Sequence, residues 1–251
     1  MDRLLDEIES YWSTRTEGYS EVNEKELKGM QKKAWLKTLE SGFLEKKLSD
    51  NDKEHLRILD IGTGPGFFPM ILAEAGYHVT AVDYTPGMLE KAAENAAKFI
   101  GEKSSNIEFK RMDAQALEFE DESFDVIISR NLTWTLPHVS HAYREWIRVL
   151  KKGGVLLNFD ANYGITDFSN VEDLPENHAH NMLGNEMMRE CEEIKRQLPI
   201  SSYSRPAWDL ETLGAMSLKE FHVDLGISSR IYLEKDAFYN PTPLFMLRTI
   251  K

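Results

Sequence analysis

The spacing of apolar residues changes several times along the chain, and the changes predict alternating strands and helices. Two short, nearly continuous apolar runs lie at Leu56–Ile61 and Val79–Val82. Between them, apolar residues recur at helical spacing over 67–72 and stop at Gly76. A switch from strand-like to helical periodicity and back is typical of a parallel βαβ unit.

The same alternation continues through the rest of the chain. Further strands are predicted at 107–111, 124–129, 155–159, 221–227 and 242–248. Helices are predicted at 4–8, 27–43, 86–96, 137–150 and 205–217. Strands that alternate with helices favour an α/β fold with a doubly wound, mostly parallel sheet.

A glycine-rich turn, Gly62-Thr63-Gly64-Pro65-Gly66, joins the first strand to its helix. Glycine lets the backbone approach a ligand without a Cβ in the way, and the helix that follows points free N–H groups at the same place. Asp83 ends the second strand, where a carboxylate can accept hydrogen bonds from two ribose hydroxyls. The turn and the acid together predict a site for a nucleoside-containing ligand.

The glycine spacing separates two classes of ligand. Dinucleotide sites use G-x-G-x-x-G, with pyrophosphate on the helix N-terminus. Here the position of the third glycine in that pattern is Phe67, which leaves an NAD(P)-dependent oxidoreductase as the weaker alternative. The pattern with Asp60 before the glycines and Asp83 after the next strand resembles motif I of the class I S-adenosylmethionine (SAM) methyltransferases.

This resemblance covers roughly residues 10–160, and it is to small-molecule enzymes with a methyltransferase-domain-11-like, UbiE-like core. It implies a Rossmann-like, seven-stranded methyltransferase sheet whose last strand is antiparallel. It also implies that SAM is the cofactor and S-adenosylhomocysteine the product. The alternatives are a SAM-binding regulator that does not transfer methyl and a purely structural α/β module.

The segment Trp12-x-x-Arg15-x-x-x-Tyr19 resembles the stretch that folds over the cofactor in many of these enzymes. Aromatic faces stabilise a sulfonium cation, and an arginine can pair with the methionine carboxylate. Alternatively, Trp12 and Tyr19 form the buried face of a small N-terminal helix. We expect residues 1–50 to form a helical cap and 51–251 the SAM-binding domain, with a helical insertion at about 163–205 acting as a lid.

Two further strand ends carry candidate cofactor contacts. Asp113-Ala114 matches the acid and small residue that, in the resembled family, bracket the adenine; otherwise Asp113 only caps a turn. Tyr84 and Met88 either pack near the adenine or are ordinary packing residues. The expected cofactor-binding residues are Trp12, Arg15, Tyr19, Asp60, Gly62, Thr63, Gly64, Gly66, Asp83, Tyr84, Thr85, Met88, Asp113, Ala114, Arg130, Asn131 and Trp134.

The segment Ser129–Trp134 follows the fourth strand, which flanks the first at the point where strand order reverses. It should therefore face the transferred methyl group. It lacks the Asn/Asp-Pro-Pro-aromatic motif of amino-directed DNA and protein-glutamine methyltransferases, which argues against those substrates. Arg130 and Asn131 are candidate catalytic residues, although Arg130 could simply be solvated.

The insertion after the fifth strand contains His178, His180, Glu186 and Cys191. Such residues can hold a transition metal, but their spacing matches no known site, so solvated helix positions are expected and no metal is predicted. His178 or His180 could also deprotonate an acceptor, because histidine titrates near neutral pH.

Composition bears on partners and location. The formal net charge of -12 disfavours a nucleic-acid partner, and the single cysteine excludes an internal disulfide. No apolar stretch reaches the roughly 18 residues of a membrane span, and the acidic start does not resemble a signal peptide. We expect a cytoplasmic monomer or homodimer that acts on a small molecule.

Overall fold

A computed structural model describes residues 3–43, 50–168, 184–234, 238 and 240–251. The strands are β1 (Arg57–Ile61), β2 (His78–Asp83), β3 (Ile107–Arg111), β4 (Phe124–Arg130), β5 (Leu150–Ala161), β6 (Glu220–Asp224) and β7 (Leu244–Ile250). The α-helices are α1 (Arg3–Lys28), α2 (Gln31–Phe43), α3 (Asp50–His55), α4 (Phe67–Glu74), α5 (Pro86–Ile100), α6 (Val139–Val149), α7 (Asn185–Gln197), α8 (Ala207–Gly214) and α9 (Ile227–Ile231). Short 3-10 turns include η2 (Thr133–Thr135) and η3 (Tyr163–Ile165).

The seven strands form one sheet in the order β3-β2-β1-β4-β5-β7-β6. Neighbours from β3 to β5 pair in parallel, whereas β7 lies antiparallel between β5 and β6. The predicted doubly wound sheet with an antiparallel last strand is confirmed. Because β1 and β4 are parallel neighbours, their carboxyl ends lie at the same edge of the sheet. The strand order reverses between them, and such folds bind ligands at that point.

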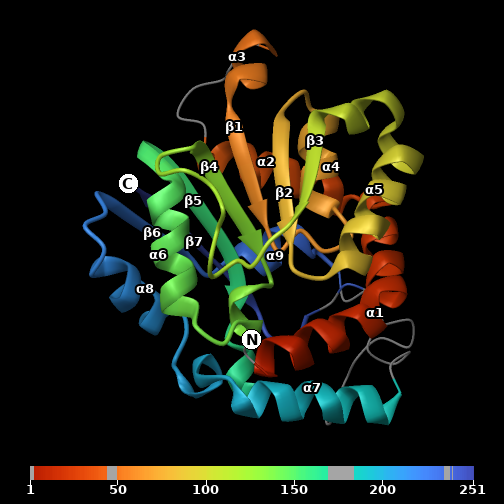
Figure 1. Ribbon diagram of the computed structural model, residues 1–251, viewed down its shortest axis with the longest axis vertical. Coiled ribbons are helices and arrows are strands. Elements are labelled where there is room, and N and C mark those ends of the chain that lie inside the picture. Colours follow the sequence, from red (N-terminus) through yellow and green to blue (C-terminus); the bar gives the residue numbers. More distant parts are fainter. Residues whose placement is uncertain (1–2, 44–49, 169–183, 235–237, 239) are drawn as a thin grey trace.

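Helices cover both faces of the sheet (Figure 1). Successive residues of a strand point to opposite faces, so Ile127 packs in the cluster with α6 while Val126 and Ile128 pack in the cluster with α2, α4 and α9. Trp146 of α6 and Trp35 of α2 are fully buried on the two sides. The buried strands therefore sit in the middle of a three-layer structure.

The N-terminal helix differs from the prediction. Instead of a short helix and a longer one beginning near Leu27, α1 runs unbroken for 26 residues, and α2 begins after the break at Gly29-Met30. The apolar stripe of α1 is continued after Tyr11 by small buried polar residues such as Thr16 and Ser20. A prediction from apolar periodicity alone therefore ends the first helix too early.

The observed bounds of other strands and helices differ from the predicted bounds by a few residues. Strand β6 ends at Asp224 because α9 follows, and β5 begins at Leu150 with a bulge opposite Phe124. The predicted helix over 205–217 is α8, and the last strand begins at Leu244. His178 and His180 lie outside the described residues.

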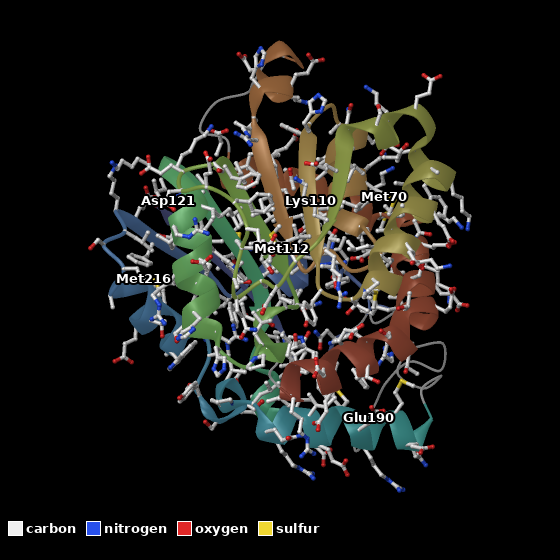
Figure 2. All side chains as sticks on the ribbon, in the orientation of Figure 1. Met70, Lys110, Met112, Asp121, Glu190 and Met216 are labelled. Atoms are coloured by element: carbon white, nitrogen blue, oxygen red, sulfur yellow. The ribbon has the colours of Figure 1, made fainter. Side chains whose placement is uncertain are left out.

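Helix α1 lies across the carboxyl ends of the parallel strands, with α7 beside it (Figure 1). Side chains fill the space between sheet and helices, and charged ones such as Glu190 of α7 and Asp121 project from the surface (Figure 2). Within the described part of the chain, no helix has the length and apolar character needed to cross a membrane.

Candidate functional site

A pocket lies where the carboxyl ends of β1, β2 and β4 and the segment after β3 approach α1. Its walls combine apolar side chains with acidic and amide groups. It is lined by Leu5, Ile8, Glu9, Trp12, Tyr19, Ile61, Gly62, Gly64, Val82, Asp83, Tyr84, Thr85, Met88, Met112, Asp113, Ala114, Arg130, Asn131, Leu132, Thr135 and Leu136.

Most of the expected cofactor-binding residues are brought together here. Those that line the pocket are Trp12, Tyr19, Gly62, Gly64, Asp83, Tyr84, Thr85, Met88, Asp113, Ala114, Arg130 and Asn131. Five others do not line it: Arg15, Asp60, Thr63, Gly66 and Trp134.

Sequence reasoning missed several apolar residues of the wall. Leu5 and Ile8 come from the stripe of α1, and Met112 directly precedes Asp113. Their position next to predicted site residues was the available signal. Leu136, after η2, had no such signal.

The glycine turn adopts left-handed backbone angles, with φ of 69° at Gly62, 53° at Gly64 and 90° at Gly66. A Cβ added at Gly64 would lie 3.5 Å from the Tyr19 ring, so glycine keeps the space between the turn and α1 open. The N–H groups of the turn itself are bonded within the protein. The amide N–H of Gly64, for example, donates to an Asp83 carboxylate oxygen at 2.8 Å.

Asp83 is held at the end of β2 by the backbone on both sides. Its Oδ2 accepts from the N–H of Gly64 and its Oδ1 from the N–H of Thr85, at 2.8 and 2.9 Å. Each oxygen retains a further lone pair. Burial raises the pKa of this carboxyl group. The carboxyl group is therefore oriented to accept from two neighbouring hydroxyls.

Asp113 is oriented by Gln115, whose role was not recognised from the sequence. The Asp113 Oδ1 accepts from the Gln115 backbone N–H at 2.8 Å and from its Nε2 at 3.1 Å. The Ala114 carbonyl accepts from Trp146 Nε1 at 2.9 Å. Both pocket residues after β3 are thus fixed in place.

Asp60 does not line the pocket and is buried near the end of β1. Burial raises its pKa to about 7, although the Thr63 hydroxyl and the nearby Arg130 favour the ionised form. The charge state of this buried carboxyl group is therefore coupled to Arg130, which does line the pocket.

Arg130 is not solvated. Its Nη1 lies 3.0 Å from both carboxylate oxygens of Glu26 in α1, and its guanidinium sits 4.5 Å from the Phe67 ring centroid. Phe67, the bulky residue that argued against a dinucleotide site, thus packs against the Arg130 guanidinium.

Aromatic side chains gather beside the β4 end of the pocket. Trp12 packs edge-on against Tyr19 and Trp134, with ring centroids 5.6 and 6.3 Å apart. Trp12 and Tyr19 lie on a helix and also line the pocket. Arg15 points elsewhere, because its Nη1 donates to the Tyr11 hydroxyl at 2.9 Å.

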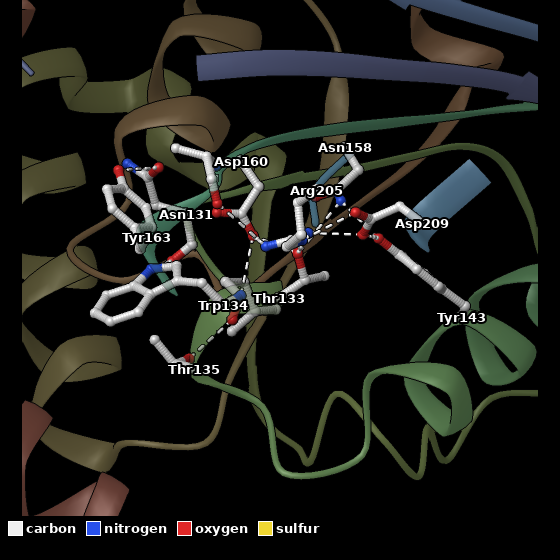
Figure 3. A network of polar contacts seen from close by, with 12 residues as sticks. Asn131, Thr133, Trp134, Thr135, Tyr143, Asn158, Asp160, Tyr163, Arg205 and Asp209 are labelled. Carbon is white, nitrogen blue, oxygen red and sulfur yellow. Dashed lines mark hydrogen bonds and ion pairs between the residues drawn. The ribbon is translucent and has the colours of Figure 1, made fainter. Parts of the chain in front are cut away.

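A buried polar network supports the segment after β4 (Figure 3). Arg205 lies between two carboxylates, with Nη1 3.1 Å from Asp160 and Nη2 2.7 Å from Asp209. Asp160 in turn accepts from the Trp134 backbone N–H at 3.0 Å and from the Thr133 hydroxyl. The network fixes the loop that carries Asn131.

Of the four candidate residues named in the insertion, Glu186 and Cys191 belong to the described part of the chain, and they differ in exposure to solvent. Glu186 is exposed on α7, whereas Cys191 is buried against Tyr11, and burial raises the pKa of its thiol. Among the residues that the structure describes, no group of three or more His, Cys, Asp or Glu could hold a metal ion.

This donor and acceptor set suits SAM. Two acids at adjacent strand ends, an apolar wall between them and an open turn match a ribose, an adenine and an amino-acid chain without phosphate. The glycine turn does not form a pyrophosphate cradle, since its N–H groups at Gly62, Thr63, Gly64 and Gly66 are already bonded.

Comparison with known proteins agrees with this geometry. A family described as "Methyltransferase domain" matches residues 59–158. The chain is 31% identical over 187 residues to a demethylmenaquinone methyltransferase of Leptospira interrogans, covering 70% of this chain and 71% of that protein.

Solved structures show the same fold. A SAM-dependent methyltransferase of Methanococcus maripaludis, described as putative, superposes with a TM-score of 0.51 at 22% identity, over 78% of this chain and 77% of the other. Phosphoethanolamine N-methyltransferase 2 of Haemonchus contortus, in complex with SAM, gives 0.56 at 20% identity, over 86% and 51%. The chain therefore belongs to the class I SAM-dependent methyltransferases, and its cofactor is S-adenosylmethionine.

Proposed function

We propose that the pocket under α1 is the SAM site of this methyltransferase and that the methyl acceptor is a small molecule. In this assignment Asp83 accepts from the ribose hydroxyls, and Asp113 and the Ala114 backbone contact the adenine. Gly64 leaves room for the methionine part. The observation that carries the assignment is the Asp83 carboxyl group, held by two backbone N–H groups with one acceptor position left on each oxygen.

The position of the acceptor follows from the strand order. The segment after β4, with Asn131 and Trp134, lies at the reversal point beside the methionine end of the proposed site. Trp12 and Tyr19 close the same end from α1. We assign α1, within the expected cap of residues 1–50, as a cap and about 163–205 as a lid over this end, since α7 packs against α1; α2 instead covers one face of the sheet.

Two observations favour a small acceptor over a nucleic acid. The chain carries a net charge of -12, which repels a polyphosphate. The related Leptospira protein is named for a small-molecule substrate, demethylmenaquinone. A soluble, cytoplasmic enzyme fits such an acceptor.

The protein's main task is to place the acceptor. Bound SAM supplies a methyl group already activated on a sulfonium, and the aromatic rings of Trp12 and Tyr19, which line the pocket, provide a surface that stabilises a cation. Orientation of two bound reactants lowers a barrier by roughly 7–11 kcal/mol. Arg130 and Asn131 are the described candidates for contacting the reacting groups.

The deciding experiment combines calorimetry with an acceptor screen. Micromolar binding of S-adenosylhomocysteine, no binding of NADH, and a loss of more than tenfold in Asp83→Ala would support the site, because the substitution removes a charged partner of two hydroxyls. Transfer of labelled methyl from SAM to a compound in a small-molecule panel would support the acceptor class. Unchanged affinity in Asp83→Ala would remove the ribose assignment.

A further inference from the structure

The glycine turn has no N–H group to offer a carboxylate. The N–H groups of Gly62 and Thr63 both donate to the Val82 carbonyl, at 2.9 and 3.0 Å, and that of Gly66 donates to the Thr63 carbonyl. Gly64 is bonded to Asp83, and Pro65 has no N–H. The α-carboxylate of a bound SAM molecule would therefore need a donor other than the N–H groups of these turn residues.

Two arginines lie near this end, and only one of them lines the pocket. Arg15 does not line it; its Nη1 donates to Tyr11, and its buried Nε has no partner among the described residues. Arg130 does line it, but Glu26 compensates its charge through contacts of 3.0 Å to both carboxylate oxygens. Asn131 is the next residue of the wall.

Asn131 is held in a constrained conformation at the end of β4. Its φ of 56° lies in the left-handed region, which asparagine tolerates better than most residues. Its backbone N–H donates to the Phe159 carbonyl at 2.8 Å, and its carbonyl accepts from Trp134 Nε1 at 3.0 Å. Constrained non-glycine residues concentrate at functional sites.

A chain of hydrogen bonds fixes which way the Asn131 amide points. The Thr242 backbone N–H can only donate, and it donates to Asn240 Oδ1 at 3.0 Å. Asn240 Nδ2 therefore donates to the Tyr163 hydroxyl at 2.8 Å. The hydroxyl must then donate onward to Asn131 Oδ1, at 3.1 Å (Figure 3).

The consequence is a directed donor. With its Oδ1 occupied by Tyr163, Asn131 has its Nδ2 left for the pocket, and no described residue accepts from that atom in any hydrogen bond of the structure. Burial raises the pKa of Tyr163, so the phenol keeps the proton that it donates. The orientation is thus insensitive to pH in the ordinary range.

We propose that the Asn131 amide donates to the α-carboxylate of SAM, and that Tyr163 and Asn240 are positioning residues that aim it. The proposal rests on the assignment of the pocket as the SAM site. It gives Tyr163 in η3 and Asn240 before β7, which lie outside the glycine motif, a part in cofactor binding.

The test uses two ligands that differ only in the carboxylate. S-adenosylhomocysteine is compared with its decarboxylated form, which keeps the adenosine, the sulfur and the amine. Asn131→Asp preserves side-chain size and tolerance of the left-handed conformation, but places a negative charge where the amide stood. We expect at least a tenfold loss of affinity for S-adenosylhomocysteine and a change of less than about twofold, or a gain, for the decarboxylated ligand.

Asn240→Asp tests the positioning chain without touching the pocket. An aspartate still accepts from Thr242, but its carboxylate accepts a hydrogen bond from the Tyr163 hydroxyl, whereas the asparagine amide donates one to that hydroxyl. The hydroxyl then accepts from Asn131 Nδ2, the amide turns over, and its oxygen faces the carboxylate. We expect a loss of about fivefold or more for S-adenosylhomocysteine alone.

Tyr163→Phe should lower the same affinity by a smaller factor, because the amide becomes free to turn. The matched control is Tyr203→Phe, whose ring is stacked on Trp208 with centroids 4.9 Å apart and which should bind like the wild type. Equal losses for both ligands in Asn131→Asp, or no loss for either, would overturn the carboxylate assignment. Failure of the wild type to bind either ligand would instead refute the proposed SAM site itself.

Discussion

Glu26 and Arg130, which are 104 positions apart in the sequence, form a buried ion pair in which Nη1 lies 3.0 Å from both carboxylate oxygens. Glu26 also accepts from Trp35 Nε1 at 2.8 Å and from the Tyr232 hydroxyl at 3.1 Å. One carboxylate therefore joins α1 to α2, to the end of β4 and to the segment after α9. The pair fixes the cap on the core next to the proposed SAM site.

Replacement of Glu26 by alanine should leave the Arg130 charge buried without a partner. We expect the free energy of unfolding to fall by about 3–5 kcal/mol, measured by urea denaturation. The control is Glu24→Ala, since Glu24 pairs with Lys98 at the surface of the same helix and should contribute no more than about 1 kcal/mol. Similar losses in the two variants would show that Arg130 does not depend on its buried partner.

Asp60 should make the protein less stable as the pH rises. Its folded-state pKa of about 7 exceeds the ordinary value of 3.8, because burial disfavours the charge. Between these values the folded state holds a proton that the unfolded state has lost, so the free energy of unfolding decreases with increasing pH.

Asp60→Asn removes this titration. The decrease in unfolding free energy between pH 5 and pH 8 should be smaller in the variant by up to about 3 kcal/mol, measured by urea titrations at each pH. Parallel pH profiles for the wild type and the variant would contradict the assignment.

A side chain at Gly64 should block the pocket. Gly64→Val adds a Cβ that faces Tyr19 and imposes a strained φ of 53°, so we expect both a stability loss of about 1 kcal/mol or more and a loss of over tenfold in S-adenosylhomocysteine affinity. Gly76→Val is the matched control. Gly76 has a φ of 95° and open space around its Cβ position, so that variant should lose stability but bind normally. Normal binding by Gly64→Val would show that the turn does not approach the ligand.

Arg205→Met should be severely destabilising, because Asp160 and Asp209 would face each other in the interior without a cation. Loss of one partner of a buried ionic group costs about 3–5 kcal/mol, which thermal and urea denaturation will detect. Arg230→Met provides the comparison, since Arg230 pairs with Asp224 while its side chain stays 53% exposed. That change should alter stability by less than about 1 kcal/mol.

The fold and most of the pocket could be predicted because local patterns carry them. The turn from Gly62 to Gly66 and the acids Asp83 and Asp113 are each adjacent to a strong apolar run, so periodicity places them at the ends of strands. The order of strands then brings these ends together. Each of these inferences needed only short-range information.

What could not be predicted depends on contacts between distant segments. The Glu26–Arg130 pair, the Arg205–Thr133 bond of the buried network and the Asn240–Tyr163–Asn131 chain connect residues separated by 32 to 104 positions. Single polar residues with no periodicity give no indication of their partners. Arg15 is an example. Its guanidinium suits a carboxylate, and the sequence gives no sign that it instead donates to the Tyr11 hydroxyl and does not line the pocket.

The placement of β7 has a consequence for synthesis of the protein. In the described sheet β6 pairs only with β7, and β7 also forms the antiparallel partner of β5. A ribosome makes β6 first, so β6 has no neighbour and one edge of β5 stays open until residues 244–250 emerge. Pairing of such distant segments is slow, and open edges invite association with other chains. Until residues 244–250 are available, this open edge leaves the nascent chain exposed to association with other chains.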